Sequence, residues 1–170
     1  GLDKGAQGIY AIYDLGGGTF DISLLKLEQG VFQVLATAGD TALGGDDFDQ
    51  AVAAWLLTDL GYGDAKLDSG QISALVALAR EAKHSLTDAT VAGLSYRDKS
   101  TELPRDVFDN LIRPYVDKTV DTCMQALRDA KLSTADIKGV VMVGGSTRVP
   151  RVKQKVQECC GQKLLTAVNP

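Results

Sequence analysis

The stretch "YDLGGGTFD", residues 13–21, places three consecutive glycines between two aspartates, and apolar runs flank it on both sides. Glycine lacks a Cβ, so Gly16, Gly17 and Gly18 can adopt positive φ and turn successive N–H groups toward one point. Such a nest lets the backbone approach a phosphate closely, and Thr19 adds a hydroxyl donor at the same rim. The stretch therefore predicts a phosphate-binding turn. A hairpin turn without any ligand is the alternative interpretation.

The two aspartates cannot bind phosphate directly, because like charges repel. Asp14 and Asp21 are suited instead to a divalent or monovalent cation, to cation-bound water, or to accepting a proton from an attacking water. The motif is not a Walker A loop, since no Gly-Lys-Ser/Thr follows, and it is not a dinucleotide fingerprint, since a strand comes next. Glycines and acids together predict a site for a metal and a nucleotide.

A second glycine-rich turn follows a buried strand in "VGGSTRVP", residues 143–150. The backbone at Gly144 and Gly145 can pass close to a ligand, next to the hydroxyl of Ser146. The guanidinium of Arg148 can stack on a purine face. An ordinary strand-to-helix turn with a solvated arginine is the alternative.

A third, weaker pattern is "REAKHSLTD", residues 80–88. Lys83 and Thr87 are i, i+4 neighbours on one helix face and could contact a ribose or a phosphate, although a solvated helix face explains them as well. His84 is the only histidine of the chain. No acid or cysteine partner is indicated for it, so we do not expect a catalytic role.

Hydrophobic periodicity predicts an α/β chain that starts with three strands in an antiparallel meander. Asp46 or Asp47 is expected to cap the first helix, and Asp68 with Gln71 resembles a capping box of the second, on whose apolar stripe Ile72 lies. Pro104 is expected to open a further helix, and Pro114 to break or restart it. The expected elements are strands at 9–13, 19–27 and 31–38, helices at 48–60 and 72–86, a hairpin within 90–103, helices from 104 and after 114, a strand at 140–143 and a helix from 150.

Composition excludes several classes of function. The net charge is about −4 and no Lys/Arg block is longer than two residues, so a nucleic-acid partner is not expected. No apolar segment approaches the roughly 20 residues that span a membrane. Cys123, Cys159 and Cys160 fit neither a zinc site nor a disulfide framework. The adjacent pair could form a strained vicinal disulfide or respond to oxidants, but two small residues near a helix end in a reducing cytosol are the simpler interpretation.

The chain starts with "GLDKGAQG" directly before a strand-like run and ends at Asn169-Pro170. These ends predict an excised piece of a longer protein.

The segments "DLGGGTFD", "GDTALGGDDFD", "EAKHSL" and "VMVGGSTRVP" together resemble the ATPase domain of the 70-kDa heat-shock chaperone family, in the family's order and over essentially all 170 residues. Within that family the chain looks most like the bacterial HscA branch, which serves iron–sulfur cluster assembly. The general DnaK-type chaperone is the nearest alternative.

The resemblance implies an actin/sugar-kinase-like (ribonuclease H-like) α/β ATPase fold in which two lobes close on ATP. This chain corresponds to the second lobe only. Residues 1–43 and 113–170 would form its sheet-bearing core subdomain, and residues 44–112 an outer, mainly helical subdomain with a hairpin.

The resemblance also implies roles for single residues, with ATP or ADP, Mg²⁺ and K⁺ as cofactors. Asp14 would lie near the metal and the attacking water, with Thr19 as its catalytic companion, and Asp21 near a monovalent cation. The expected phosphate-binding residues are Gly16, Gly17, Gly18 and Thr19. The expected adenosine-binding residues are Gly144, Gly145, Ser146 and Arg148 on one side and Arg80, Lys83 and Thr87 on the other.

One position departs from the family pattern. The general chaperones have a glutamate where this chain has Arg80, within the segment that clamps the nucleotide. The loss of that carboxylate predicts easier nucleotide release than in the general branch.

The implied function is a cytoplasmic chaperone ATPase that hydrolyses ATP to control client peptide binding. The implied partners are a J-domain co-chaperone, a client such as an iron–sulfur scaffold protein, and a nucleotide-exchange factor. An actin-like or sugar-kinase-type ATPase is one rival, although no sugar-facing acid is evident. A binding module without chemistry is another, and we expect negligible hydrolysis by this chain alone.

Overall fold

The computed structural model describes residues 7–160 and 163–166 and divides the chain into two compact units. Unit 1 comprises Gly1–Gly45 and Val116–Pro170, and unit 2 comprises Asp46–Tyr115. The sequence had placed these divisions after residues 43 and 112. The end residues that suggested an excised piece, 1–6 and 169–170, lie outside the described residues.

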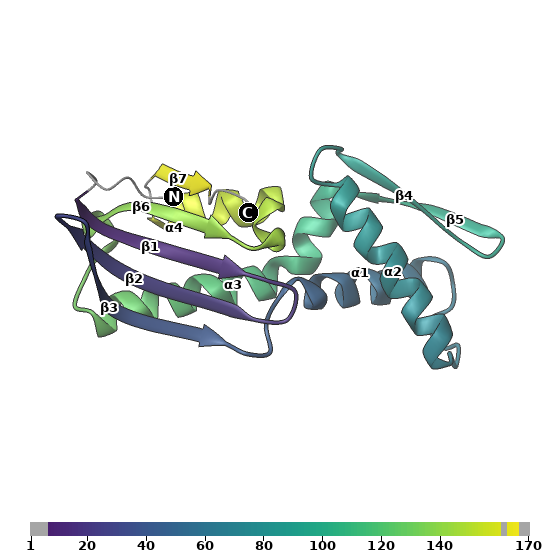
Figure 1. Ribbon diagram of the computed structural model, residues 1–170. Helices are drawn as coiled ribbons and strands as arrows, with labels where there is room; N and C mark the ends of the chain where they lie inside the picture. Colours follow the sequence, from purple (N-terminus) through teal and green to yellow (C-terminus); the bar gives the residue numbers. More distant parts are fainter. Residues whose placement is uncertain (1–6, 161–162, 167–170) are drawn as a thin grey trace. The chain divides into compact units, whose positions relative to one another are not determined.

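Unit 1 contains a five-stranded sheet in the order β3-β2-β1-β6-β7 (Figure 1). The first three strands form the predicted antiparallel meander, and β6 runs parallel to β1. The sequence did not predict the last strand, which runs parallel to β6 and extends the parallel part of this mixed sheet. The strands are β1 Gly8–Leu15, β2 Phe20–Glu28, β3 Val31–Asp40, β6 Ile137–Val143 and β7 Lys163–Thr166.

Helices α3 (Arg105–Asp129) and α4 (Pro150–Cys160) provide the helical side of the unit 1 core. Cys123 of α3 and Val156 of α4 line the same apolar interior as Tyr13 of β1. The Tyr13 hydroxyl donates to Thr119 Oγ1 of α3 at 2.7 Å, a buried contact that ties the central strand to the helix. Two short 3₁₀ helices, η1 (Thr134–Asp136) and η2 (Gly145–Arg148), flank β6.

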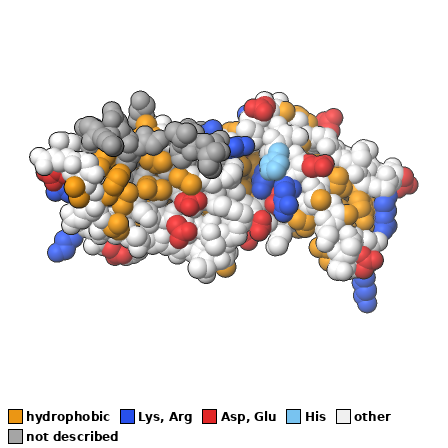
Figure 2. All heavy atoms as spheres, in the orientation of Figure 1, with side chains coloured by type: hydrophobic (Ala, Val, Ile, Leu, Met, Phe, Trp, Pro, Cys, Tyr) orange, Lys and Arg blue, Asp and Glu red, His pale blue; other side chains and the backbone are white. Residues whose placement is uncertain are grey.

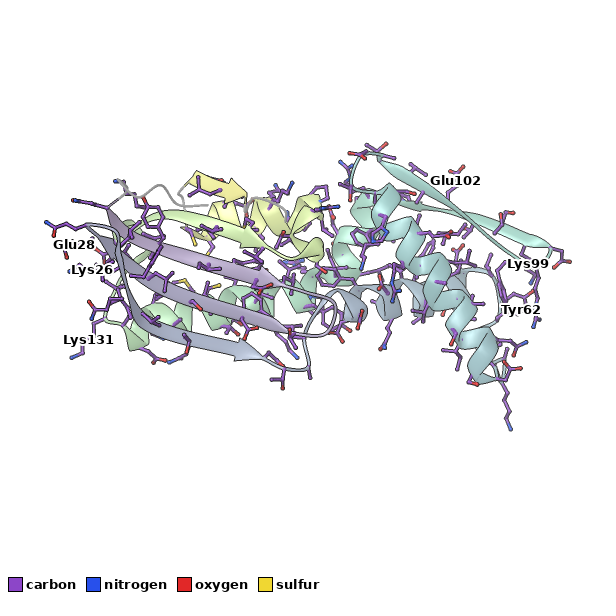
Figure 3. The ribbon with its side chains drawn as sticks, in the orientation of Figure 1. Lys26, Glu28, Tyr62, Lys99, Glu102 and Lys131 are labelled. Carbon is purple, nitrogen blue, oxygen red and sulfur yellow. The ribbon has the colours of Figure 1, made fainter. Side chains whose placement is uncertain are left out.

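Unit 2 consists of helices α1 (Gly45–Asp59) and α2 (Ser69–Ser85), the hairpin of β4 (Val91–Tyr96) and β5 (Lys99–Pro104), and the first part of α3. Trp55 lies half-buried on α1. The hairpin is fastened to the end of α1 by Lys99, whose Nζ donates to the Leu60 carbonyl at 2.9 Å and lies 4.6 Å from the centre of the Tyr62 ring (Figure 3). The predicted hairpin is confirmed.

The helix ends confirm some of the predicted signals and correct others. The capping box is present, since the Gln71 N–H donates to Asp68 Oδ1 at 2.7 Å and the Asp68 N–H to Gln71 Oε1 at 3.0 Å. Helix α1 begins at Gly45, so Asp46 and Asp47 lie in its first turn and do not cap it. Carboxylates there still favour the helix, because they face the positive end of its dipole.

Three further predictions about helices are wrong. Pro104 is the last residue of β5, and α3 begins only at Arg105. Pro114 lies inside an unbroken α3. It removes the hydrogen bond to the carbonyl of Asn110, but both residues are exposed and water can satisfy that carbonyl. Ile72 is 50% exposed, because it lies in the first turn of α2 beyond the buried part of the stripe.

No helix in the described part of the chain combines the length and the hydrophobicity that a membrane span requires.

Candidate functional site

The first part of the candidate site is the β1–β2 turn of unit 1. The Gly16 N–H donates to the Thr19 carbonyl at 3.0 Å and closes the turn. Gly17, Gly18 and Thr19 are exposed, and their N–H groups have no acceptor within the described part of the chain. Three consecutive free N–H groups at a strand end are suited to bind an anion.

The turn does not use the positive φ that the sequence led us to expect of its glycines. Among the described glycines, positive φ occurs at Gly8, Gly30, Gly61 and Gly144. The glycine-rich sequence serves close approach of neighbouring backbone more than unusual torsion angles.

The second glycine-rich turn lies directly against the first. Gly144 has φ +96°, and a Cβ on it would lie 2.3 Å from the Leu15 carbonyl oxygen, so only glycine fits. The Ser146 hydroxyl is buried and donates to the Gly16 carbonyl at 3.3 Å. The contact between Ser146 and Gly16 joins residues that are 130 positions apart in the sequence. The two glycine-rich turns therefore meet at the ends of the parallel strands β1 and β6. Open α/β sheets bind their ligands at such strand ends.

A second glycine pair, Gly44 and Gly45, completes the packing around this turn. The Gly45 N–H donates to the Gly16 carbonyl at 2.8 Å, and a Cβ on Gly44 would lie 2.3 Å from the Gly17 carbonyl oxygen. The sequence analysis did not single out this pair. The Gly16 carbonyl therefore accepts from two donors, the Gly45 N–H and the Ser146 hydroxyl, which hold the turn against its neighbours.

The two aspartates of the motif lie opposite each other on β1 and β2. Neighbouring glycines leave room for them: a Cβ on Gly144 would come within 3.2 Å of Asp14 Oδ1, and one on Gly39 within 2.8 Å of Asp21 Oδ1. The pKa of Asp14 is raised, first by burial and then by the negative charge of Asp21. Sequence reasoning missed Gly39, whose only signal is a glycine inside a strand.

These carboxylates fit a cation. Neither has a basic partner among the described residues, and a positive ion would relieve their repulsion. The described residues contain no cluster of three or more side chains that could hold a metal by themselves. Mg²⁺ is commonly held by one or two carboxylates together with water and substrate phosphates. The Asp14–Asp21 pair, beside a turn suited to a phosphate, fits this kind of site.

The third predicted pattern lies in unit 2, where two of its residues, Arg80 and Lys83, form ion pairs with Asp49. Lys83 is buried, with its Nζ 2.8 Å from Asp49 Oδ1, and Arg80 Nε lies 3.3 Å from Asp49 Oδ2. The Asp49 side chain is only 1% exposed. The alternative of a solvated helix face is therefore wrong for Lys83, and Asp49 is a residue that sequence reasoning missed. A buried carboxylate requires such partners, because desolvation of an unpaired charge is costly.

The end of α2 is held by Arg105, which the sequence did not single out. Its guanidinium donates to the Leu86 carbonyl at 2.9 and 3.1 Å and to the Ala89 carbonyl at 2.7 Å. These bonds fix the turn that contains the half-buried Thr87. His84 is exposed, as the pale blue side chain in Figure 2 shows.

The structure thus assembles two groups of predicted site residues. Unit 1 brings together Asp14, Asp21, the turn of residues 16–19 and residues 144–146, with the exposed Arg148 at the end of η2. Unit 2 brings Arg80 and Lys83 onto Asp49. A shared adenosine contact of both groups stays a prediction.

A mixed α/β sheet with an exposed glycine-rich hairpin turn beside paired carboxylates is an arrangement suited to a ligand that contains phosphate and a cation. Comparison with known proteins gives the family. The family model described as "Hsp70 protein" matches residues 1–170. The chain belongs to the Hsp70 family.

Relatives with this similarity include proteins named "Chaperone protein HscA homolog" from three bacteria. The identity is 54% for Pseudomonas paraeruginosa, 53% for Pseudomonas aeruginosa and 51% for Azotobacter vinelandii, each over 170 residues. Each alignment covers 100% of this chain and 27% of the relative, so the chain spans about a quarter of their length. Nucleotide binding is a property of the Hsp70 family, whose members are ATPases in their full-length form.

Proposed function

We propose that this chain is the second lobe of the nucleotide-binding domain of an HscA-type chaperone, in which ATP hydrolysis controls the affinity of a peptide site. The observation that carries the proposal is the row of exposed N–H groups at Gly17–Thr19 beside the carboxylates of Asp14 and Asp21. Family membership favours this function over a sugar kinase.

In the proposed reaction the amides of Gly17, Gly18 and Thr19 bind the β- and γ-phosphates, next to Gly16. Asp14 orients the attacking water and accepts its proton, for which a raised pKa is useful because a stronger base drives proton transfer further. Mg²⁺, when bound, neutralises phosphate charge. Asp14 would hold it through water, and Asp21 would face a monovalent cation such as K⁺.

The proposed adenosine contacts fall into two sets of residues. Gly144 and Gly145 offer backbone, and the exposed Arg148, which has no ion pair among the described residues, is free to stack on the purine. Because the Ser146 hydroxyl already donates to Gly16, this residue would contribute through its backbone. Arg80, Lys83 and Thr87 complete the set of proposed adenosine contacts.

The decisive test is single-turnover ATP hydrolysis by the full-length protein with Asp14→Asn, using Glu28→Gln at the exposed far end of β2 as the matched control. We expect Asp14→Asn to slow hydrolysis at least about 100-fold, as for the loss of a general base, while ADP still binds. Unchanged hydrolysis in Asp14→Asn would refute the proposed site.

Calorimetric titration of this chain with ADP and Mg²⁺ measures the affinity for nucleotide that one lobe provides by itself. Binding that Arg148→Ala weakens would support the adenosine contact. We expect negligible hydrolysis by the chain alone, and turnover that disappears in Asp14→Asn would contradict that expectation.

The proposed easier nucleotide release rests on Arg80. Arg80 contacts the buried carboxylate of Asp49. In Arg80→Glu a second carboxylate would lie beside Asp49 and would compete with it for the ammonium of Lys83. We expect slower ADP release in Arg80→Glu than in the natural protein, measured by stopped-flow with a fluorescent ADP. Equal release rates would contradict the role of Arg80.

The proposed partners are a J-domain co-chaperone, an iron–sulfur scaffold client and a nucleotide-exchange factor, all in the cytoplasm. The similarity to the HscA homologs supports this branch, and the general DnaK-type chaperone is the alternative. Stimulation of the full-length ATPase by a J-domain protein, measured with and without a scaffold peptide, distinguishes them. Stimulation that the scaffold peptide does not increase would favour the general branch.

A further inference from the structure

Unit 1 contains a cluster of sulfur atoms where α3 and α4 meet. Cys123 and Met124 are neighbours on α3, and Cys159 and Cys160 form the last two residues of α4. The Cys159 Sγ lies 3.7 Å from Met124 Sδ. Cys123 and Cys160 both line the apolar interior between the sheet and the two helices. All three cysteines are free thiols.

The three thiols differ in access. Cys123 is 8% exposed and Cys160 is 9% exposed, so reagents in solution do not reach them in the folded state. Cys159 is half-buried and lines a surface hollow. The other residues that line this hollow are Val120, Met124, Lys155 and Glu158.

The three thiols also differ in charge state. The hydrogen bond with the Cys160 thiol and the nearby charge of Lys155 lower the pKa of Cys159 to about 7, against the effect of burial. Burial raises the pKa of Cys123 to about 12. The pKa of Cys160 is raised by its hydrogen bond with Cys159 and by burial. Cys159 is the most exposed of the three thiols, and its lowered pKa favours the thiolate, which is the nucleophile, near neutral pH.

We propose that Cys159 is a site of reversible thiol–disulfide exchange with low-molecular-weight disulfides such as oxidised glutathione. The Cys159 thiolate attacks one sulfur of the small disulfide, the bond between its two sulfurs breaks, and a new disulfide joins Cys159 to one half. The other half leaves as a thiolate and takes a proton from water. No further oxidant is needed, and the assignment does not depend on the proposed ATPase function.

The geometry favours this mixed disulfide over a vicinal disulfide. Adjacent Cα atoms are about 3.8 Å apart, closer than the spacing of about 4.4–6.8 Å that is usual in a disulfide. Joining Cys159 to Cys160 would therefore strain the end of α4, whereas a mixed disulfide leaves the helix unchanged. Cys160 points into the core. The ammonium of Lys155, one helical turn before Cys159, lies 4.0 Å from Glu158 Oε2. Such a surface pair is weak, so the ammonium can exchange it for a carboxylate of an anionic thiol such as glutathione.

The test treats the folded full-length protein with oxidised glutathione and locates the adduct by peptide mass mapping. We expect one adduct in the segment described here, at Cys159, formed at least about 100-fold faster than any at Cys123 or Cys160. Dithiothreitol should reverse it, and urea should make all three thiols reactive. Faster labelling of Cys123, or a product two mass units lighter without an adduct, would overturn the proposal.

A pH–rate profile tests the chemical basis. The rate should rise with pH with a midpoint near the Cys159 pKa of about 7. Lys155→Gln should move the midpoint upward and slow the reaction at neutral pH, whereas Lys153→Gln, on the exposed side of the same helix, should leave both unchanged. Cys159→Ser should remove the fast adduct. Circular dichroism checks that each variant is folded, and an unchanged profile in folded Lys155→Gln would overturn the role of its charge.

Discussion

The two groups of site residues handle polar atoms in opposite ways. At the β1–β2 turn the polar atoms are left open: three N–H groups face solvent, and two carboxylates face each other without a basic partner among the described residues. Around Asp49 they are closed, because a carboxylate that is 1% exposed is neutralised by Lys83 and Arg80. Open polar groups are available to a ligand, whereas closed ones mainly hold the protein together.

The contrast gives each group a different expected response to substitution. Substitutions at Asp49 or its partners, the closed group, should lower the free energy of unfolding. Substitutions at Asp14 or Asp21, the carboxylates of the open group, should lower function but leave the free energy of unfolding nearly unchanged or slightly higher.

The largest loss is expected for Asp49→Asn. The change removes the carboxylate charge that faces the buried ammonium of Lys83, and breaking a buried ion pair typically costs about 3–5 kcal/mol in the free energy of unfolding. Urea unfolding should show it, with Asp46→Asn, on an exposed position of the same helix, as the control. The double variant Asp49→Leu, Lys83→Met should recover much of the loss. If Asp49→Asn and Asp46→Asn had the same free energy of unfolding, the ion pairs around Asp49 would not stabilise the protein as expected.

The next effect concerns Gly144, where the backbone of the two glycine-rich turns packs too closely for a side chain. Gly144→Ala would place a Cβ 2.3 Å from the Leu15 carbonyl at a φ of +96°. We expect a loss of about 2–3 kcal/mol in the free energy of unfolding, because strained and overpacked positions are among the most costly. Gly145→Ala is the matched control, since no atom lies within 4 Å of a Cβ there. Similar losses in both variants would argue against the tight contact of the two turns.

A smaller loss is expected for a closed contact without charge. Tyr13→Phe removes the buried 2.7 Å hydrogen bond to Thr119. We expect the free energy of unfolding to fall by about 1–2 kcal/mol, since a neutral hydrogen bond contributes less than a buried ion pair. Thermal unfolding measures it, with Tyr10→Phe, on the same strand, as the reference. A loss as large as that of Asp49→Asn would mean that charge is not the distinguishing feature.

The smallest effect should have the opposite sign. The folded state raises the pKa of Asp14 and so binds its proton more tightly than the unfolded state. The ionised side chain therefore costs stability above the folded pKa, and this cost fades as the pH falls toward the ordinary aspartate range. Asp14→Asn should be slightly more stable than the natural chain at pH 7, by less than about 1 kcal/mol given solvent screening, and equal to it near pH 3. Urea unfolding at both pH values tests this, and a clear destabilisation at pH 7 would contradict it.

Local patterns predicted most of the elements because each depends on residues close in sequence. The alternation in Phe20, Ile22 and Leu24 gave β2, and the pair of Asp68 and Gln71 gave the start of α2. The two glycine-rich turns could be placed at strand ends because both follow buried apolar runs.

Features that depend on distant residues could not be predicted in this way. Asp49 and Lys83 meet only when α1 packs on α2, and no spacing in the sequence indicates it. The need for glycine at Gly39 and Gly44 becomes visible only when the carbonyls opposite them are in place. Pro114 was taken as a helix break because the sequence does not show that its side of α3 faces solvent.

The distribution of two rare side chains has a practical consequence. The single tryptophan, Trp55, lies in unit 2, and all three cysteines lie in unit 1. Tryptophan fluorescence therefore reports the unfolding of one unit, and the appearance of reactive Cys123 reports that of the other. A denaturant titration that follows the fluorescence and the reaction of Cys123 with a thiol reagent can tell whether the units unfold as one cooperative transition or as two, without any substitution in the chain.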